Sequence, residues 1–176
     1  MFLPTIKRRI LVVEDDELIA SLIEYLLQNF GFEFVGHANT AELGIELAKK
    51  LDPDLILMDI QLAGAMDGIT AAQIIYAQYT IPVVFIAGQY SEETLKRAAQ
   101  SKAFGYIAKP FVDHELRTVI EMALYKHEVE TKLQLSELAL EAISQGVFIT
   151  DPGQHILSSN VAFQRQTGYA GEELLG

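Results

Sequence analysis

The chain has 176 residues, of which 24 are acidic and 13 basic, giving a formal net charge of −11, and it contains neither cysteine nor tryptophan. This balance argues against nucleic-acid binding, which depends on clustered lysine and arginine. The lack of cysteine excludes disulfides, thiolate zinc sites and cysteine nucleophiles, and no apolar run approaches the roughly 18 residues that a bilayer requires. Residues 1–4 are too short a segment for a signal peptide, so we predict a cytoplasmic protein with one domain and part of another.

Short apolar runs alternate with amphipathic segments in the first part of the chain. The expected strands are Ile10–Val13, Phe32–Gly36, Leu55–Met58, Val83–Ile86 and Gly105–Ala108. The expected helices are Leu18–Phe30, Thr40–Lys50, Gly68–Gln78, Glu92–Ser101 and a helix that begins at Asp113. This alternation predicts an α/β fold with a doubly wound, five-stranded parallel sheet, because right-handed crossovers place helices on both faces.

The pattern changes after the fifth strand. From Asp113 to about Gln145 there is no glycine or proline, which predicts an extended helix, continuous or broken once. Val147–Thr150 then predicts a strand, followed by a turn and a second short strand near His155–Ser159. We therefore expect a first domain, a helical linker and an incomplete second module, over residues 1–125, 126–145 and 146–176 respectively.

Charged residues follow several of the expected strands. Glu14, Asp15 and Asp16 come after the first strand, Asp59 after the third and Lys109 after the fifth. In doubly wound sheets, ligands bind outside the carboxyl ends of the strands. Clustered carboxylates suit Mg²⁺, and a carboxylate beside a metal and a cation can accept a phosphoryl group. Asp59 is therefore the candidate nucleophile, with Lys109 as the neutralising cation.

Five motifs occur in order between about residues 7 and 126. They are Ile-Leu-Val-Val-Glu-Asp-Asp at 10–16, Asp-Leu-Ile-Leu-Met-Asp at 54–59, Met-Asp-Gly at 66–68, Ile-Pro-Val-Val-Phe at 81–85 and Gly-Tyr-Ile-Ala-Lys-Pro-Phe at 105–111. Together they resemble the receiver domain of two-component response regulators, a flavodoxin-like fold. The resemblance implies that Asp59 accepts a phosphoryl group from a histidine kinase or phosphotransfer protein, without small-molecule turnover by this chain.

The same resemblance implies a Mg²⁺ site at the acidic edge. Asp15, the Asp59 carboxylate and the backbone carbonyl of Gln61 match metal ligands of the family, and Glu14 matches the acid that acts through water. Lys109 matches the lysine that pairs with the phosphoryl oxygens.

Two positions concern the switch of the family. Tyr106 matches the switch aromatic, but Ala87 stands where the family usually carries a threonine or serine hydroxyl. A methyl group cannot donate a hydrogen bond, which favours an alternative reading of the chain as an interaction or dimerisation module whose switch is not driven by phosphorylation. Gly88 still offers a backbone N–H. Asp16 has no role in the resemblance, and we predict that it caps the following helix.

Other interpretations fit less well. His114-Glu115-Leu116-Arg117-Thr118 is similar to the phosphoacceptor box of sensor kinases, but it follows Lys109-Pro110-Phe111 directly, and we favour an ordinary helix start. A dehalogenase-type phosphatase would need a second aspartate where Gln61 stands. A flavin-binding protein would need a glycine-rich or hydroxyl-rich loop after the first strand. His37, His127 and His155 lack metal-ligand spacing, so we expect solvated or packed side chains.

The end of the chain carries a second resemblance. Its residues are Ala142–Asp151, Asn160 with Ala162-Phe163, and Thr167-Gly168-Tyr169 with Glu172–Gly176. From about Leu138 onward these resemble the beginning of a PAS domain, an α+β fold. The resemblance implies that the chain is a fragment in which a receiver feeds a PAS or output region through a helix. We expect that helix to mediate homodimerisation.

Overall fold

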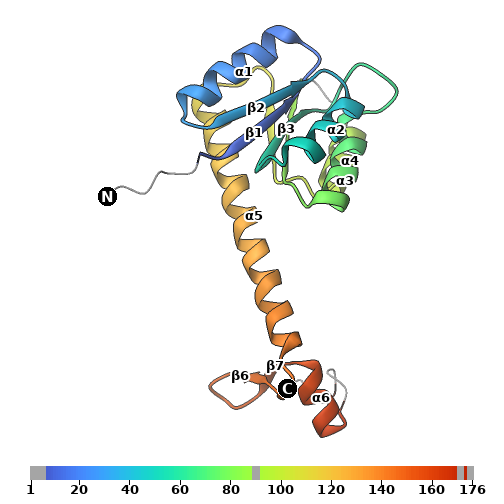
Figure 1. Ribbon diagram of the computed structural model, residues 1–176, viewed down its shortest axis with the longest axis vertical. Coiled ribbons are helices and arrows are strands. Elements are labelled where there is room, and N and C mark those ends of the chain that lie inside the picture. Colours follow the sequence, from blue (N-terminus) through green and yellow to red (C-terminus); the bar gives the residue numbers. More distant parts are fainter. Residues whose placement is uncertain (1–6, 89–91, 170–172, 174–176) are drawn as a thin grey trace. The chain divides into compact units, whose positions relative to one another are not determined.

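A computed structural model describes residues 7–88, 92–169 and 173 (Figure 1). The chain divides into two compact units, Met1–His127 and Glu128–Gly176. The opening residues 1–4, and residues 172 and 174–176 of the PAS resemblance, lie outside the described part. The domain limits expected at residues 125 and 145 stay predictions.

The first unit is built on the predicted five-stranded parallel sheet. Its strands are β1 (Arg9–Val13), β2 (Glu33–Ala38), β3 (Leu55–Asp59), β4 (Val83–Ala87) and β5 (Gly105–Ala108). Their order across the sheet is β2-β1-β3-β4-β5, with every pair parallel. The chain reverses its direction of winding between β1 and β3, and binding sites of doubly wound sheets occur beside such a point.

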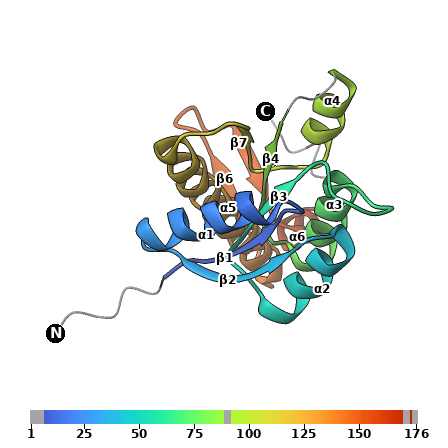
Figure 2. The ribbon, with the colours of Figure 1, turned by 90° about the horizontal axis from the view of Figure 1, so that it is seen from above.

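Helices cover both faces of this sheet (Figure 2). They are α1 (Glu17–Asn29), α2 (Ala41–Leu51), α3 (Gly68–Tyr79), α4 (Glu92–Gln100) and α5 (Asp113–Ala142), which continues into the second unit. Alternate residues of β1 serve the two faces, because side chains of a strand point to opposite sides. Ile10 and Val12 pack with α1 and α5, whereas Leu11 and Val13 pack with α2 and α3.

The second strand differs from its predicted limits. Gly36 was expected to end it, but β2 runs on to Ala38 and pairs in register with the end of β1. A Cβ at Gly36 would lie 3.0 Å from the Leu51 Cδ1 atom, so the glycine makes room for a helix side chain within the strand. The prediction was wrong because a packing glycine and a strand-ending glycine cannot be distinguished by local sequence.

Two helix predictions are confirmed. Asp16 caps α1, since its Oδ1 accepts hydrogen bonds from the N–H groups of Leu18 and Ile19 at 2.8 and 3.2 Å. The long helix is unbroken from Asp113 to Ala142. Among the described residues, no helix combines the length and the apolar character needed to cross a membrane.

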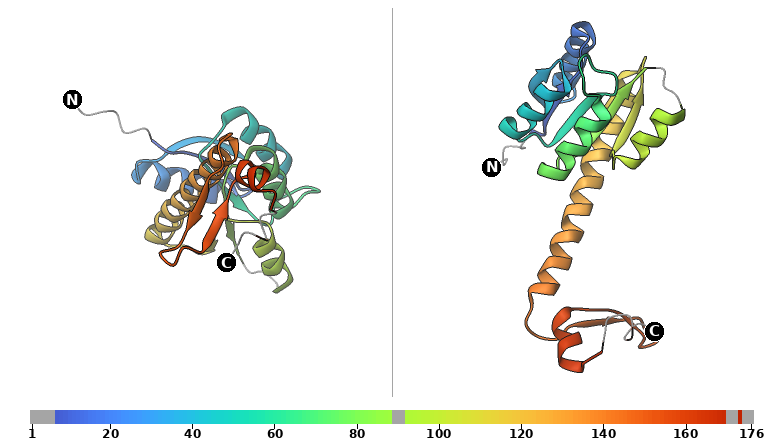
Figure 3. Two further views of the ribbon diagram at one scale, coloured as in Figure 1. Left: turned by 90° about the horizontal axis from the view of Figure 1, so that it is seen from below. Right: turned by 90° about the vertical axis from the view of Figure 1, so that its right-hand side faces the viewer.

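The second unit contains a hairpin and a short helix after the end of α5. Strands β6 (Phe148–Thr150) and β7 (Ile156–Ser159) pair antiparallel, and α6 spans Val161–Thr167 (Figure 3). The predicted strand, turn and strand are therefore present.

A single buried amide connects the parts of this unit. Asn160 is 4% exposed and its Oδ1 accepts from the N–H groups of Val147 and Phe163 at 2.9 and 3.0 Å. Its Nδ2 lies within hydrogen-bonding distance of three backbone carbonyls, those of Leu140 (3.0 Å), Ile143 (3.3 Å) and Gln145 (3.0 Å). Because buried polar groups are costly unless bonded, this network fixes the end of α5 to the start of α6.

In the first unit, one carboxylate, that of Asp67, caps the start of α3 and also pairs with a side chain of α4. Asp67 Oδ1 accepts from the backbone N–H and the hydroxyl of Thr70 at 2.9 and 2.7 Å, and its Oδ2 pairs with Arg97 at 2.7 Å. Burial alone would raise the pKa of Asp67. The hydrogen bonds from Thr70 and Arg97 outweigh this effect and hold the pKa below its ordinary value.

Two substitutions of Asp67 distinguish the contribution of the helix cap to stability from that of the ion pair. Asp67→Asn keeps a good cap and loses only the partly exposed pair with Arg97, so we expect a loss of less than about 1 kcal/mol of unfolding free energy at pH 7. Asp67→Ala also loses the cap, which costs about 1 kcal/mol more.

Because the pKa of Asp67 is lowered, the difference in unfolding free energy between wild type and Asp67→Asn depends on pH. The folded state holds the ionised carboxyl more strongly than the unfolded state does, so the contribution is complete above about pH 4 and disappears as the pH falls below it. Urea unfolding from pH 7 to pH 3 measures it. A constant difference between wild type and Asp67→Asn across this range would contradict the assignment.

Candidate functional site

The carboxyl ends of β1, β3 and β5 bring charged residues together. Glu14 and Asp15 follow β1, Asp59 ends β3 and Lys109 follows β5. One carboxylate oxygen from each of Glu14, Asp15 and Asp59 lies within 4.8 Å of the other two. The acids and the lysine that the sequence placed at one edge of the sheet are therefore adjacent in space.

Lys109 bridges two of these acids. Its Nζ lies 2.6 Å from Glu14 Oε2 and 2.5 Å from Asp59 Oδ2, and the side chains of Glu14, Asp59 and Lys109 are 2%, 8% and 17% exposed. Burial would lower the pKa of Lys109, but the hydrogen bonds and charges of Asp59 and Glu14 outweigh it and raise that pKa. Lys109 therefore stays a cation.

Negative charge exceeds positive charge at this point. Burial, reinforced by repulsion from Asp59, raises the pKa of Glu14 even though Lys109 acts in the opposite direction. One ammonium group faces two buried carboxylates and the exposed Asp15 beside them. A hard divalent cation with oxygen ligands fits this donor set.

The Asp59 carboxylate is held from two sides. Its Oδ1 accepts the backbone N–H of Gln61 at 2.9 Å, while its Oδ2 contacts Lys109. The side chain therefore has one orientation, at the open end of the sheet. The contribution of the Gln61 carbonyl to a metal site stays a prediction.

Gly68 sets the position of Asp59 through the backbone. A Cβ at Gly68 would lie 1.9 Å from the carbonyl oxygen of Asp59, and the Gly68 N–H donates to the Ile60 carbonyl at 3.0 Å. Only a residue without a side chain allows α3 to begin this close to the end of β3. The Met-Asp-Gly motif contained this residue, but its role is visible only once the two segments are placed together.

The two switch positions lie on β4 and β5. Ala87 ends β4, is 3% exposed, and its carbonyl accepts the Lys109 N–H at 2.7 Å. Tyr106 lies beside Phe85 in the parallel register, with its hydroxyl oxygen buried. The side chain at position 87 is a methyl, so the link from this position to Tyr106 is packing and backbone only.

The histidines occupy different environments. His114 lies exposed in the first turn of α5. His127 packs edge-on against Phe104 with ring centroids 5.4 Å apart, and His155 contacts Asp151 at an exposed position. His37 differs, because its Nε2 lies 2.6 Å from the carbonyl oxygen of Glu14. Sequence patterning gave no signal for this contact.

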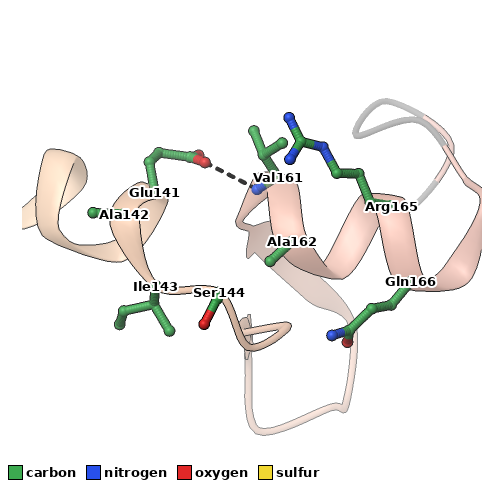
Figure 4. A pocket seen from close by; sticks show the side chains of 8 residues that line it. All are labelled: Glu141, Ala142, Ile143, Ser144, Val161, Ala162, Arg165 and Gln166. Carbon is green, nitrogen blue, oxygen red and sulfur yellow. Dashed lines mark hydrogen bonds between the residues drawn. The ribbon is translucent and has the colours of Figure 1, made fainter.

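A hollow of about 660 Å³ lies in the second unit, between the end of α5 and α6 (Figure 4). Glu141 lines it and accepts the Val161 N–H at 2.9 Å, and Arg165 and Gln166 project from α6. Its lining includes none of the residues predicted to take part in phosphoryl transfer.

Residues 10–121 match the family model of the response regulator receiver domain. The chain belongs to this family. The transcriptional regulatory protein PdtaR of Mycobacterium tuberculosis is 33% identical to the receiver chain over 129 residues, which cover 73% of the chain and 62% of PdtaR. The chain thus spans less than two thirds of the length of this relative.

Solved receiver domains share the fold. The signal receiver domain of a modulated diguanylate cyclase from Desulfovibrio desulfuricans G20 is 35% identical with a TM-score of 0.68, covering 70% of this chain and 98% of that one. The N-terminal domain of a response regulator/sensory box/GGDEF three-domain protein from Carboxydothermus hydrogenoformans is 34% identical with a TM-score of 0.65, covering 70% and 99%.

The close approach at Gly68 predicts a large cost of adding a methyl group. We expect Gly68→Ala to lower the unfolding free energy by about 3 kcal/mol, because overpacking against backbone cannot be relieved by rotating a side chain. Gly88→Ala is the matched control, since a Cβ there meets nothing within 4 Å, and we expect a change within about 0.5 kcal/mol. Urea unfolding measures both, and equal midpoints would contradict the contact.

Proposed function

We propose that this receiver accepts a phosphoryl group on Asp59 from a phosphorylated histidine kinase or phosphotransfer protein and does not itself turn over a small molecule. The observation that carries the proposal is the bridge from Lys109 to both Asp59 and Glu14 at the open edge of the sheet. It combines a fixed carboxylate nucleophile, a cation and additional acids, which is the set that phosphoryl transfer to a carboxylate requires.

The transfer step follows from these groups. A carboxylate oxygen of Asp59 attacks phosphorus, the bond from phosphorus to the donor histidine nitrogen breaks, and the nitrogen keeps the bonding electrons. Lys109 is a cation before the transfer, because Asp59 and Glu14 raise its pKa, and its charge neutralises the phosphoryl oxygens. Asp15, Asp59 and the Gln61 carbonyl would hold Mg²⁺, with Glu14 acting through water, and the ion would neutralise charge on the transferred group.

We infer that the second unit begins a PAS domain that receives the signal through α5. The hairpin β6–β7 and the buried Asn160 at the start of α6 support this reading. The relative from Carboxydothermus hydrogenoformans is itself described as a response regulator joined to a sensory box and a GGDEF domain. A receiver followed by a sensory module is the order proposed for this chain.

One observation favours a second candidate function. Ala87 supplies no hydroxyl to a phosphoryl group, so phosphorylation of Asp59 would leave Tyr106 without its usual hydrogen-bonded link. In this alternative the domain acts as an interaction module whose conformation does not depend on phosphorylation.

A small phosphodonor tests the first proposal directly. The full chain is incubated with Mg²⁺ and acetyl phosphate and its intact mass is measured. We expect wild type to gain one phosphoryl group and Asp59→Asn to gain none. Asp54→Asn is the matched control, because Asp54 stands just before the other end of β3, where it pairs with Arg8 and accepts the Arg9 N–H, and it should gain the group like wild type.

The result also separates the two candidates. An unmodified wild type would refute phosphorylation at this site. Modification accompanied by slower or faster amide hydrogen exchange in β4 and β5 supports a phosphorylation-driven switch. Modification with unchanged exchange supports the second candidate.

Exposed apolar side chains on α5 support association with a second copy. Beyond residue 127, Val129 and Leu133 are 46% and 59% exposed, and Leu140 follows Leu133 by seven residues on the same helix. Residues four or seven apart lie on one helix face, so these three form a stripe, here called the α5 stripe. We propose that the α5 stripe pairs with the same stripe of another chain, as in a coiled coil.

A charge in the α5 stripe should weaken this association. We expect Leu133→Glu to raise the dimer dissociation constant at least about tenfold, since a carboxylate would be buried at the interface. Leu135→Glu is the matched control, because Leu135 is 61% exposed but two residues away and therefore on another face. Light scattering over a concentration series measures the mass, and a monomeric wild type would contradict the proposal.

A further inference from the structure

We propose that His37 is a positioning residue for the metal site, because its ring N–H fixes the peptide bond that joins Glu14 to Asp15. The inference rests on the proposed function, since it concerns the acids expected to hold Mg²⁺. It adds a residue from β2, the strand at the edge of the sheet, to a site otherwise built from β1, β3 and β5.

The backbone of Glu14 is tied to β2 by both of its polar atoms. The Glu14 N–H donates to the carbonyl of Ala38 at 2.9 Å, which extends the ladder one step beyond the end of β1. The Glu14 carbonyl faces His37 Nε2 at 2.6 Å. A carbonyl oxygen only accepts hydrogen bonds, so His37 carries a proton on Nε2 and donates it.

The contact of His37 with the Glu14 carbonyl helps to direct the side chains of two adjacent acids, Glu14 and Asp15, to the same site. Neighbouring side chains of an extended strand point to opposite faces, yet carboxylate oxygens of Glu14 and Asp15 both lie within 4.8 Å of Asp59. The chain must therefore leave the extended course between the two residues. The direction of the Glu14 carbonyl defines the plane of that turning peptide, and His37 holds this carbonyl.

Asp15 depends on that peptide more than its neighbour does. The Glu14 side chain is buried and fixed by Lys109 at 2.6 Å, whereas Asp15 is exposed. A freely rotating peptide would leave Glu14 in place but let the Asp15 carboxylate move away from the site. His37 thus acts on Mg²⁺ through Asp15, in the way that outer groups orient the ligands of metal sites.

Two amide variants differ in reach and test the bond. Glutamine places an N–H close to the position of the histidine Nε2, and asparagine is shorter by one methylene group. We expect His37→Asn to raise the Mg²⁺ dissociation constant of the full chain about tenfold, and His37→Gln to keep it within about threefold of wild type. Calorimetric titration with MgCl₂ alone, without phosphodonor, measures both.

A second measurement needs no metal. The Asp15 N–H belongs to the same peptide group as the Glu14 carbonyl, so its resonance in a ¹H–¹⁵N spectrum responds to the hydrogen bond. In the metal-free protein this resonance should move in His37→Asn and stay near its wild-type position in His37→Gln. Circular dichroism melting verifies that each variant is folded.

The outcomes distinguish this inference from the proposed function. Equal Mg²⁺ affinity of wild type and His37→Asn would overturn the role of His37 and leave the phosphoacceptor proposal intact. A wild type that does not bind Mg²⁺ would overturn the metal site itself. If His37→Asn melts at a lower temperature but binds Mg²⁺ normally when folded, His37 only stabilises the fold and the inference fails.

Discussion

The contact of Lys109 with Glu14 and Asp59 is the interaction on which the rest of the site depends. It joins residues separated by 95 and 50 positions in the chain, and the parallel sheet brings the carboxyl ends of the three strands to one edge. Two buried carboxylates near each other would repel strongly in a medium of low dielectric. The shared ammonium makes that arrangement tolerable, and the sheet supplies the rigidity that keeps all three groups in place.

The same contact leaves a residual negative charge, which explains what the site can bind. The pKa of Glu14 is raised because burial and the charge of Asp59 oppose its ionisation. A second cation at this point would reduce the repulsion between the two carboxylates. Asp15 is exposed and offers access from solvent. The site thus combines two buried carboxylates held by Lys109 with the exposed carboxylate of Asp15. The position of the Asp15 carboxylate depends on the backbone peptide that precedes it.

Most of the fold could be predicted from local sequence patterns. The alternation of apolar runs with amphipathic segments predicted all five strands of the sheet, and the charges that end β1, β3 and β5 predicted which residues converge. The strand end that was predicted wrongly and the two roles that the sequence did not reveal all depend on contacts between separate segments. Gly36 makes room for Leu51, Gly68 for the Asp59 backbone, and His37 reaches a carbonyl 23 positions earlier in the chain. No periodicity or motif spacing encodes such a contact.

The alanine at position 87 changes how Asp59 is connected to its surroundings. Without a hydroxyl there, the Asp59 carboxylate keeps its contacts with the Gln61 N–H and with Lys109, whose N–H also bonds the Ala87 carbonyl. The Asp59 backbone keeps its close approach to Gly68 at the start of α3. This approach continues outward, because Asp67 caps α3 and pairs with Arg97 on α4. A displacement of the Asp59 backbone would therefore shift α3 through the packed backbone at Gly68, and α4 through the partly exposed ion pair between Asp67 and Arg97. Such a pair is weak and screened by salt, so this connection couples less firmly than a buried hydroxyl would.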